Sequence, residues 1–158
     1  MKRGDLSKSH YVGFIRHAQR ADKYHDPRVE SQFTVKEDPP ITTLGRHQAT
    51  LMGRILKDFF EQNNMKFDKV VMQCSPFLRC IQTANQISEA LGLISEIEVN
   101  YLYCEHLNEA SFPQGNPIKN LVYEVSKKNK KMFKQRYGIS EEVNIYDKGL
   151  NKGESLKL

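Results

Sequence analysis

Three short apolar runs, each ending at polar residues, predict buried strands. They cover residues 11–15, 68–74 and 97–101. The stretches between and after these runs carry apolar residues three or four positions apart, which is the spacing of a helix face. Strands that alternate with helices of this length predict an α/β fold, with a mostly parallel sheet and helices flanking both of its faces.

Capping residues place the ends of the first two predicted helices. The first begins at Thr42 or Thr43, either of which can cap it, and ends near Asn63. Its larger apolar residues share one face: Leu44, Leu51, Ile55, Phe59 and Phe60. The second begins at the cap Ser75, which Pro76 follows, and it stops at a glycine. Its inward residues are Ile81, Ala84, Ile87 and Leu91, and the glycine is Gly92.

A third predicted helix begins at Asn116-Pro117 and ends at Gly138. Apolar residues follow helical spacing within it, at Leu121, Val122, Val125, Met132 and Phe133. The basic residues of the same segment supply much of the net charge of +5: Lys127, Lys128, Lys130, Lys131, Lys134 and Arg136. The solvated face of an amphipathic helix explains them better than a nucleic-acid site does. A basic nucleic-acid binder is the less favoured alternative, and it predicts binding that weakens steeply with salt.

Length and composition indicate one globular domain. The chain has 158 residues, of which 39% are hydrophobic and 27% charged. No apolar run approaches the roughly 20 residues that a membrane helix needs, and the N-terminus lacks the apolar core of a secretory signal. A cytoplasmic location without membrane contact is therefore expected. The three cysteines are odd in number and lack metal-like spacing, which argues against a disulfide scaffold or a zinc site.

Polar residues follow each predicted strand at the point where it ends. Arg16-His17 follows the first strand, Arg79 comes soon after the second, and Glu105 and Glu109 follow the third. In such sheets the ligand crevice lies beyond the carboxyl ends of the strands. Arginine binds two phosphate oxygens at once and keeps its charge, so this set predicts a phosphate site. No metal or organic cofactor is expected, because the arginines supply the positive charge.

His17 is the predicted nucleophile of this site. A neutral imidazole can attack phosphorus and form a phosphohistidine, which divides one difficult displacement into two easier ones. The arginines would neutralise the phosphoryl oxygens, and a carboxylic acid must protonate the leaving oxygen. Glu109 or Glu105 can supply that proton, and the pattern leaves the choice open.

Four segments, in order, resemble motifs of the histidine phosphatase superfamily, also called the phosphoglycerate mutase-like family. Residues 16–18 resemble its Arg-His-Gly motif, and residues 41–49 its Leu-Thr-x-x-Gly-x-x-Gln-Ala helix start. Residues 75–84 are similar to its Ser-Pro-x-x-Arg-x-x-Gln-Thr-Ala segment, and residues 107–109 stand where its acid usually follows. The resemblance implies a phosphatase that forms a phosphohistidine.

The resemblance also assigns roles to individual residues. It implies that His17 is the nucleophile, Glu109 the acid, and Arg16 and Arg79 phosphate ligands. Residues 16–22 are similar to the Arg-His-Gly-x-Arg-x-Asp form of the ubiquitin-associated, SH3-containing signalling phosphatases, which adds Arg20 to the phosphate ligands. This favours a phosphatase over a phosphoglycerate mutase. The expected substrate is a phosphorylated small molecule or a phosphoprotein, and the oligomeric state is left open.

The chain departs from the family pattern at two points. Ala18 replaces a glycine, and no histidine follows His106, whereas the family carries a second histidine on a later strand. In the family that strand lies between the strand ending at His17 and the one ending near Ser75. Without it two apolar strands would leave backbone groups unpaired, so residues 1–158 are interpreted as a single, incomplete domain. A catalytically inactive phosphate-binding or protein-interaction module of the same fold is the alternative.

Overall fold

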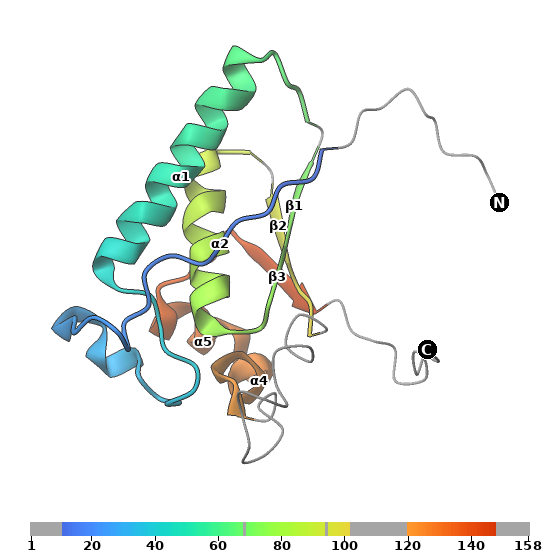
Figure 1. The fold of residues 1–158 in the computed structure, drawn as a ribbon. Coiled ribbons are helices and arrows are strands. Elements are labelled where there is room, and N and C mark those ends of the chain that lie inside the picture. Colours follow the sequence, from blue (N-terminus) through green and yellow to red (C-terminus); the bar gives the residue numbers. More distant parts are fainter. Residues whose placement is uncertain (1–10, 68, 94, 102–119, 148–158) are drawn as a thin grey trace, which may run out of the picture.

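The chain folds around a small parallel sheet. The computed structural model describes residues 11–67, 69–93, 95–101 and 120–147 (Figure 1). The sheet has the order β1-β2-β3, and all of its strands are parallel. Its strands are β1 (Val70–Cys74), β2 (Ser95–Val99) and β3 (Asn144–Asp147). The α/β class and the strands near residues 68–74 and 97–101 are confirmed, while β3 was not anticipated.

One face of the sheet forms the core. Ile97 and Val99 on β2 are fully buried and share a cluster with Ile145 on β3. The same cluster includes residues of three helices, α2 (Leu78–Leu91), α4 (Val122–Ser126) and α5 (Lys130–Tyr137). These helices therefore pack against a single face of the sheet.

The opposite face is polar. Gln73 donates to the carboxylate of Glu98 at 2.9 Å, and the Tyr146 hydroxyl donates to the other oxygen of that carboxylate at 3.1 Å. Glu96 and Glu98 alternate with Ile97 and Val99 along β2, so one face of that strand is acidic while the other is apolar. Among the described residues, the expected helical cover of this second face is not seen.

Helix α1 (Thr43–Gln62) forms an outer layer on α2 (Figure 1). It begins as predicted, because the Thr42 hydroxyl accepts the N–H of Gly45 at 2.8 Å. Its buried positions are small: Gly45, Ala49 and Gly53. A Cβ on Gly53 would lie 2.7 Å from the carbonyl oxygen of Ile87, so close packing on α2 requires glycine there.

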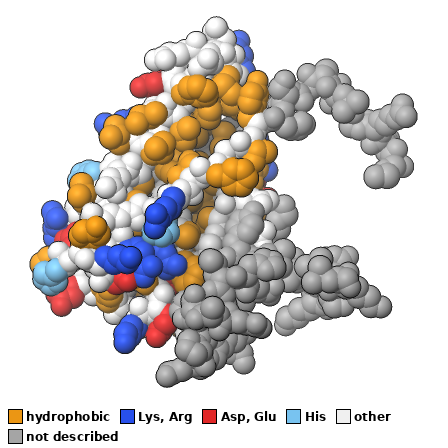
Figure 2. Space-filling view, in the orientation of Figure 1, with side chains coloured by type: hydrophobic (Ala, Val, Ile, Leu, Met, Phe, Trp, Pro, Cys, Tyr) orange, Lys and Arg blue, Asp and Glu red, His pale blue; other side chains and the backbone are white. Residues whose placement is uncertain are grey.

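The larger apolar residues of α1 lie on its exposed side. Leu44, Leu51, Ile55 and Phe59 are each about half exposed, in contrast to the usual arrangement in which an apolar stripe faces the core. Figure 2 shows hydrophobic side chains spread over α1 and the neighbouring N-terminal segment. The apolar face of this helix was identified correctly, but it does not contribute to the described core.

Helix α2 begins at Leu78, two residues after the predicted first helical residue, Pro76. Its N-cap is Phe77, whose side chain makes no capping hydrogen bond, so the prediction of Ser75 as the cap is wrong. The buried carboxylate of Asp38 accepts the N–H of Leu78 instead, at 2.7 Å. The predicted inward face is confirmed, and the helix ends at Gly92, whose φ of 66° is the left-handed conformation expected of a C-terminal glycine.

The basic segment forms short helices rather than one long helix. A 3-10 turn, η3 (Lys127–Asn129), separates α4 from α5, and the Asn129 side chain caps α5 by accepting the N–H of Met132. The predicted end at Gly138 is confirmed, whereas the predicted start at Asn116-Pro117 lies outside the described residues. Val125 and Met132 are exposed, so the predicted apolar face is only partly buried. None of the described helices is long and apolar enough to cross a membrane.

The expected buried strand at residues 11–15 is wrong. Val12 and Phe14 are 82% and 96% exposed, and the segment pairs with no strand among the described residues. Backbone groups form a strand only where a neighbour accepts their hydrogen bonds, and β1 pairs with β2 alone in this sheet. The chain becomes anchored just after this segment, where an antiparallel bridge joins Arg20 to Ile41.

Candidate active site

The His17 ring is held in one tautomer. Its Nδ1 lies 2.8 Å from the carbonyl oxygen of Ala18, and a carbonyl oxygen only accepts hydrogen bonds. Nδ1 therefore carries the hydrogen and donates it, which leaves the lone pair on Nε2 of the neutral ring. The side chain is half-buried at the surface. A ring in this state can act as a nucleophile through Nε2.

Burial and positive charge keep His17 neutral. Partial burial is the main cause that lowers the pKa of His17 below its ordinary value of 6.5. The charges of Arg79, Arg16 and Arg20 lower this pKa further, and the hydrogen bond to Ala18 opposes them. The predicted histidine and its three predicted arginines therefore lie close enough to interact electrostatically.

The three arginines differ in their surroundings. Arg16 is exposed, whereas Arg20 forms a bidentate salt bridge with Asp22, with distances of 2.9 Å from Nε to Oδ1 and 2.6 Å from Nη2 to Oδ2. The Arg79 side chain is only 12% exposed. Figure 2 shows Lys and Arg side chains gathered around a histidine below the hydrophobic area on α1.

Arg79 has buried donors without partners. Its Nε and Nη1 atoms make no hydrogen bond to any described residue, and its guanidinium carbon lies 3.9 Å from the centroid of the Phe77 ring. Burial lowers the pKa of Arg79, but an arginine stays protonated at neutral pH. Buried donors that lack an acceptor cost free energy, so this guanidinium is suited to an anionic ligand.

Thr83 connects the His17 segment to the turn that carries Arg79. Its hydroxyl oxygen accepts the backbone N–H of Ala18 at 3.1 Å and donates to the carbonyl oxygen of Arg79 at 2.7 Å. The side chain of Thr83 on α2 thus links the backbone beside His17 to the backbone of Arg79. Thr83 belongs to a motif quoted above, but it was not predicted as a site residue.

Asp38 is a second neighbour of the site that sequence reasoning missed. Its Oδ1 lies 3.9 Å from Arg79 Nη1, and its side chain is fully buried. Burial raises the pKa of Asp38 to about 6, although two backbone N–H donors and the charge of Arg79 act in the opposite direction. The sequence showed only an acidic residue at the end of a polar loop, with no signal of burial.

Other predicted residues lie outside the described part of the chain. Glu109 and Glu105, the two candidate acids, both fall in the range 102–119. Within the described ranges, no group of three His, Cys, Asp or Glu side chains is arranged to hold a metal ion.

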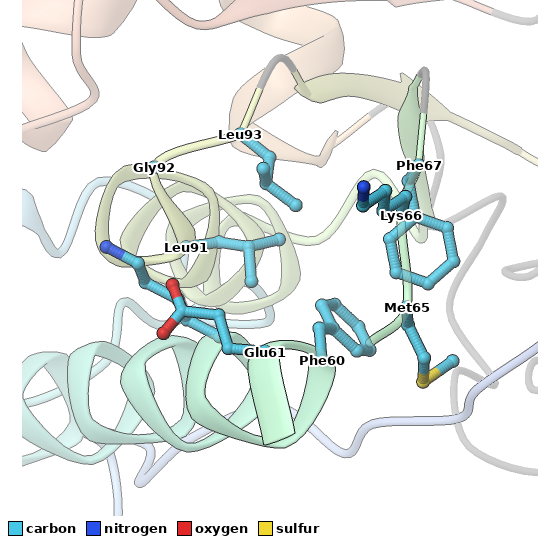
Figure 3. Close-up of a pocket in the computed structure, with 9 residues that line it drawn as sticks. Phe60, Glu61, Met65, Lys66, Phe67, Leu91, Gly92 and Leu93 are labelled. Atoms are coloured by element: carbon cyan, nitrogen blue, oxygen red, sulfur yellow. The ribbon is translucent and has the colours of Figure 1, made fainter. Parts of the chain in front are cut away.

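A separate cavity lies far from His17. It has a volume of about 270 Å³ and lies between the C-terminal ends of α1 and α2 (Figure 3). The rings of Phe60 and Phe67 meet edge to face beside it, with Leu93 on the other side and Lys57 and Lys66 also in its lining. Leu91 of this cavity and Arg79 lie at opposite ends of α2, about 18 Å apart at the rise of an α-helix. The cavity is therefore separate from the arginine cluster.

Comparisons with known proteins place the chain in a family. The comparison with curated proteins gave no match. Among solved structures, the chain is similar to the ecdysone phosphate phosphatase, EPPase, from Bombix mori in complex with tungstate, with 18% identity and a TM-score of 0.44. That alignment covers 89% of this chain but 58% of the phosphatase, so the chain spans less than two thirds of that structure. The family model of the histidine phosphatase superfamily (branch 1) matches residues 12–157. The chain therefore belongs to the histidine phosphatase superfamily.

Proposed function

We propose that this chain carries the nucleophile of a phosphatase site, which hydrolyses phosphoric monoesters through a phosphohistidine at His17. The proposal rests on one juxtaposition. A neutral imidazole whose Nε2 carries no hydrogen lies within the field of Arg79, whose buried donors have no partner among the described residues. Membership of the histidine phosphatase superfamily supports the same chemistry.

The proposed reaction has two steps. In the first, His17 Nε2 attacks phosphorus, the N–P bond forms, and the P–O bond to the leaving group breaks. The leaving oxygen takes a proton from a carboxylic acid, for which Glu109 is proposed and Glu105 is the alternative. In the second, water attacks phosphorus and gives a proton to the carboxylate left by the first step, the N–P bond breaks, and inorganic phosphate is released, which restores the acid and neutral His17.

The arginines would carry the charge of the phosphoryl group through both steps. Arg79 offers Nε and Nη1, which already lie in a water-poor environment where electrostatic stabilisation is strong. Arg16 and Arg20 add positive charge near His17. The salt bridge between Arg20 and Asp22 joins the two residues of the Arg-x-Asp form, and the likeness of residues 16–22 to the ubiquitin-associated, SH3-containing phosphatases stays part of the proposal. A phosphorylated small molecule or a phosphoprotein remains the proposed substrate.

Phosphate transfer to the protein tests the proposal. The chain is incubated with a ³²P-labelled aryl phosphate, and acid-labile, alkali-stable protein label is counted. We expect label on the natural chain and none on His17→Ala. His47→Ala is the matched control, because His47 is exposed on α1, and it should label normally. Label that persists in His17→Ala would rule out His17 as the nucleophile.

An inactive phosphate-binding module is the second candidate. It is favoured by Arg79, whose buried Nε and Nη1 suit an anion whether or not His17 reacts with it. This candidate predicts that inorganic phosphate binds and shifts the resonances of His17, while no phosphate is released from aryl phosphates. Isothermal titration together with a phosphate-release assay on the same preparation separates it from the phosphatase.

A further inference from the structure

Asp38 is fixed at the junction of three segments. Oδ1 accepts the N–H of Leu78 at 2.7 Å, and Oδ2 accepts the N–H of Val122 at 2.9 Å. The carboxylate thus contacts the first residues of both α2 and α4. Its own N–H donates to the carbonyl oxygen of Val35, and Pro39-Pro40 follows, which restricts the backbone on its C-terminal side. No part of Asp38 is exposed, so the carboxylate has little freedom to move.

The same carboxylate faces Arg79 without binding its donors. The distance of 3.9 Å between Oδ1 and Nη1 allows charge attraction but exceeds the length of a hydrogen bond. Oδ1 already accepts the N–H of Leu78, the residue before Arg79. On another side, the Phe77 ring lies against the guanidinium. Asp38 therefore balances part of the charge on Arg79 while Nε and Nη1 stay without partners among the described residues.

We propose that Asp38 is the positioning residue of Arg79, whose guanidinium it orients by charge and whose backbone it fixes through Leu78, so that Nε and Nη1 are presented to a phosphoryl group. This inference rests on the proposed function, because it assumes that Arg79 binds phosphate. It assigns Asp38 no contact with substrate. A carboxylate that served only as a cap for two helices would stabilise the fold without affecting anion binding.

The affinity for phosphate distinguishes an Asp38 that positions Arg79 from one that only caps two helices. Inorganic phosphate is titrated into the full chain at pH 7 and at a temperature where each variant is folded. Asp38→Asn should bind phosphate roughly tenfold more weakly, the size expected for losing a well-aligned charge-assisted hydrogen bond. Asp26→Asn is the matched control. Asp26 is also buried and accepts backbone N–H groups, from Arg28 and Thr43, and it should leave phosphate affinity unchanged.

The Arg79 Nε–H resonance gives a readout that a cap alone would not alter. In the natural chain it should shift on addition of phosphate, and in Asp38→Asn this shift should be lost at matched phosphate occupancy. If Asp38→Asn binds phosphate as well as the natural chain and keeps the shift, the positioning role is wrong while the proposed function stands. If the natural chain itself binds no phosphate, the proposed function fails first.

A second variant keeps the inference testable if Asp38→Asn does not fold. Arg79→Gln removes the positive charge that faces Asp38, and the Nε and Nη1 atoms that it removes make no hydrogen bond to a described residue. The Asp38 carboxyl carbon is then titrated by NMR in both chains. Its midpoint should move to higher pH in Arg79→Gln, because the facing positive charge favours the ionised form. An unchanged midpoint would overturn the inference.

Discussion

Thr83 accepts a hydrogen bond from the backbone N–H of Ala18 at 3.1 Å, although 65 positions separate the two residues. Ala18 directly follows His17, and the same hydroxyl donates to the carbonyl oxygen of Arg79. The candidate nucleophile and the candidate phosphate ligand are therefore both held by the first turns of α2. The His17 segment needs such an attachment, because the residues that precede it are exposed and unpaired within the described chain.

Thr83→Val should separate His17 from α2. Valine keeps the shape of threonine but leaves the part-buried N–H of Ala18 without its acceptor, at a cost of about 1 kcal/mol in unfolding free energy. We also expect a lower rate of labelling at His17, measured with the aryl phosphate described above. Thr50→Val is the control, because the Thr50 hydroxyl also donates a hydrogen bond within the part-buried region, to Gln86 at 3.2 Å, but joins α1 to α2, and it should label at the normal rate. Equal labelling of both variants would contradict the linking role.

Stability should depend on pH through Asp38. Its folded-state pKa of about 6 lies above its ordinary value of 3.8, so the folded chain binds this proton more tightly than the unfolded chain. The resulting stability is complete below pH 3.8 and is lost as the pH rises through 6. Between these limits, the unfolding free energy of the natural chain should fall by about 3 kcal/mol relative to Asp38→Asn. Urea titrations of both chains measure the difference.

Asp26 should change the unfolding free energy with pH in the opposite direction to Asp38. Its pKa lies below the ordinary value, chiefly because the N–H of Thr43 and the side chain of Arg28 bind the ionised carboxylate. The stability that the ionised Asp26 adds to the fold is therefore present above the ordinary pKa of 3.8 and is lost as the pH falls below it. The natural chain should gain stability relative to Asp26→Asn as the pH rises in the acid range. Slopes of the same sign for the Asp26 and Asp38 variants would contradict at least one of the two assignments.

Local rules predicted several helix ends, although not the start of α2. Thr42 caps α1 with its own side chain, and Gly92 and Gly138 end their helices in the left-handed conformation, all within a few positions of the residues they serve. His17, Arg16 and Arg79 were singled out because their residue types indicate phosphate chemistry, and Arg20 was added by the family resemblance; the roles of all four stay predictions.

Features that depend on distant partners were not predictable in the same way. Asp38 acquires its role from Leu78 and Val122, which follow it by 40 and 84 positions. The run at residues 11–15 has the composition of a strand, but a strand also needs a neighbour. The buried face of α1 consists of small residues, which carry little weight in a pattern of large apolar side chains.

Gly53→Ala tests the packing of α1 on α2. The added Cβ would lie 2.7 Å from both the Ile87 carbonyl oxygen and the Ala90 Cβ, so the two helices must move apart. Overpacking of this kind costs about 1–3 kcal/mol, which exceeds the gain of up to about 1 kcal/mol in helix propensity. Thermal unfolding should show a lower midpoint. Gly13→Ala, where nothing lies within 4 Å of the added carbon, should leave the midpoint unchanged.

Phe14→Ser tests the exposed state of the N-terminal apolar run. Phe14 is 96% exposed, so its replacement should change the unfolding free energy by no more than about 0.5 kcal/mol. A phenylalanine buried in a strand would instead cost about 3–5 kcal/mol when truncated. Ile81→Ala provides the buried reference, because Ile81 is fully buried in the core and its truncation should cost about 2–5 kcal/mol. Urea unfolding of the two variants side by side decides the matter, and a large loss in Phe14→Ser would show that this run is buried in solution.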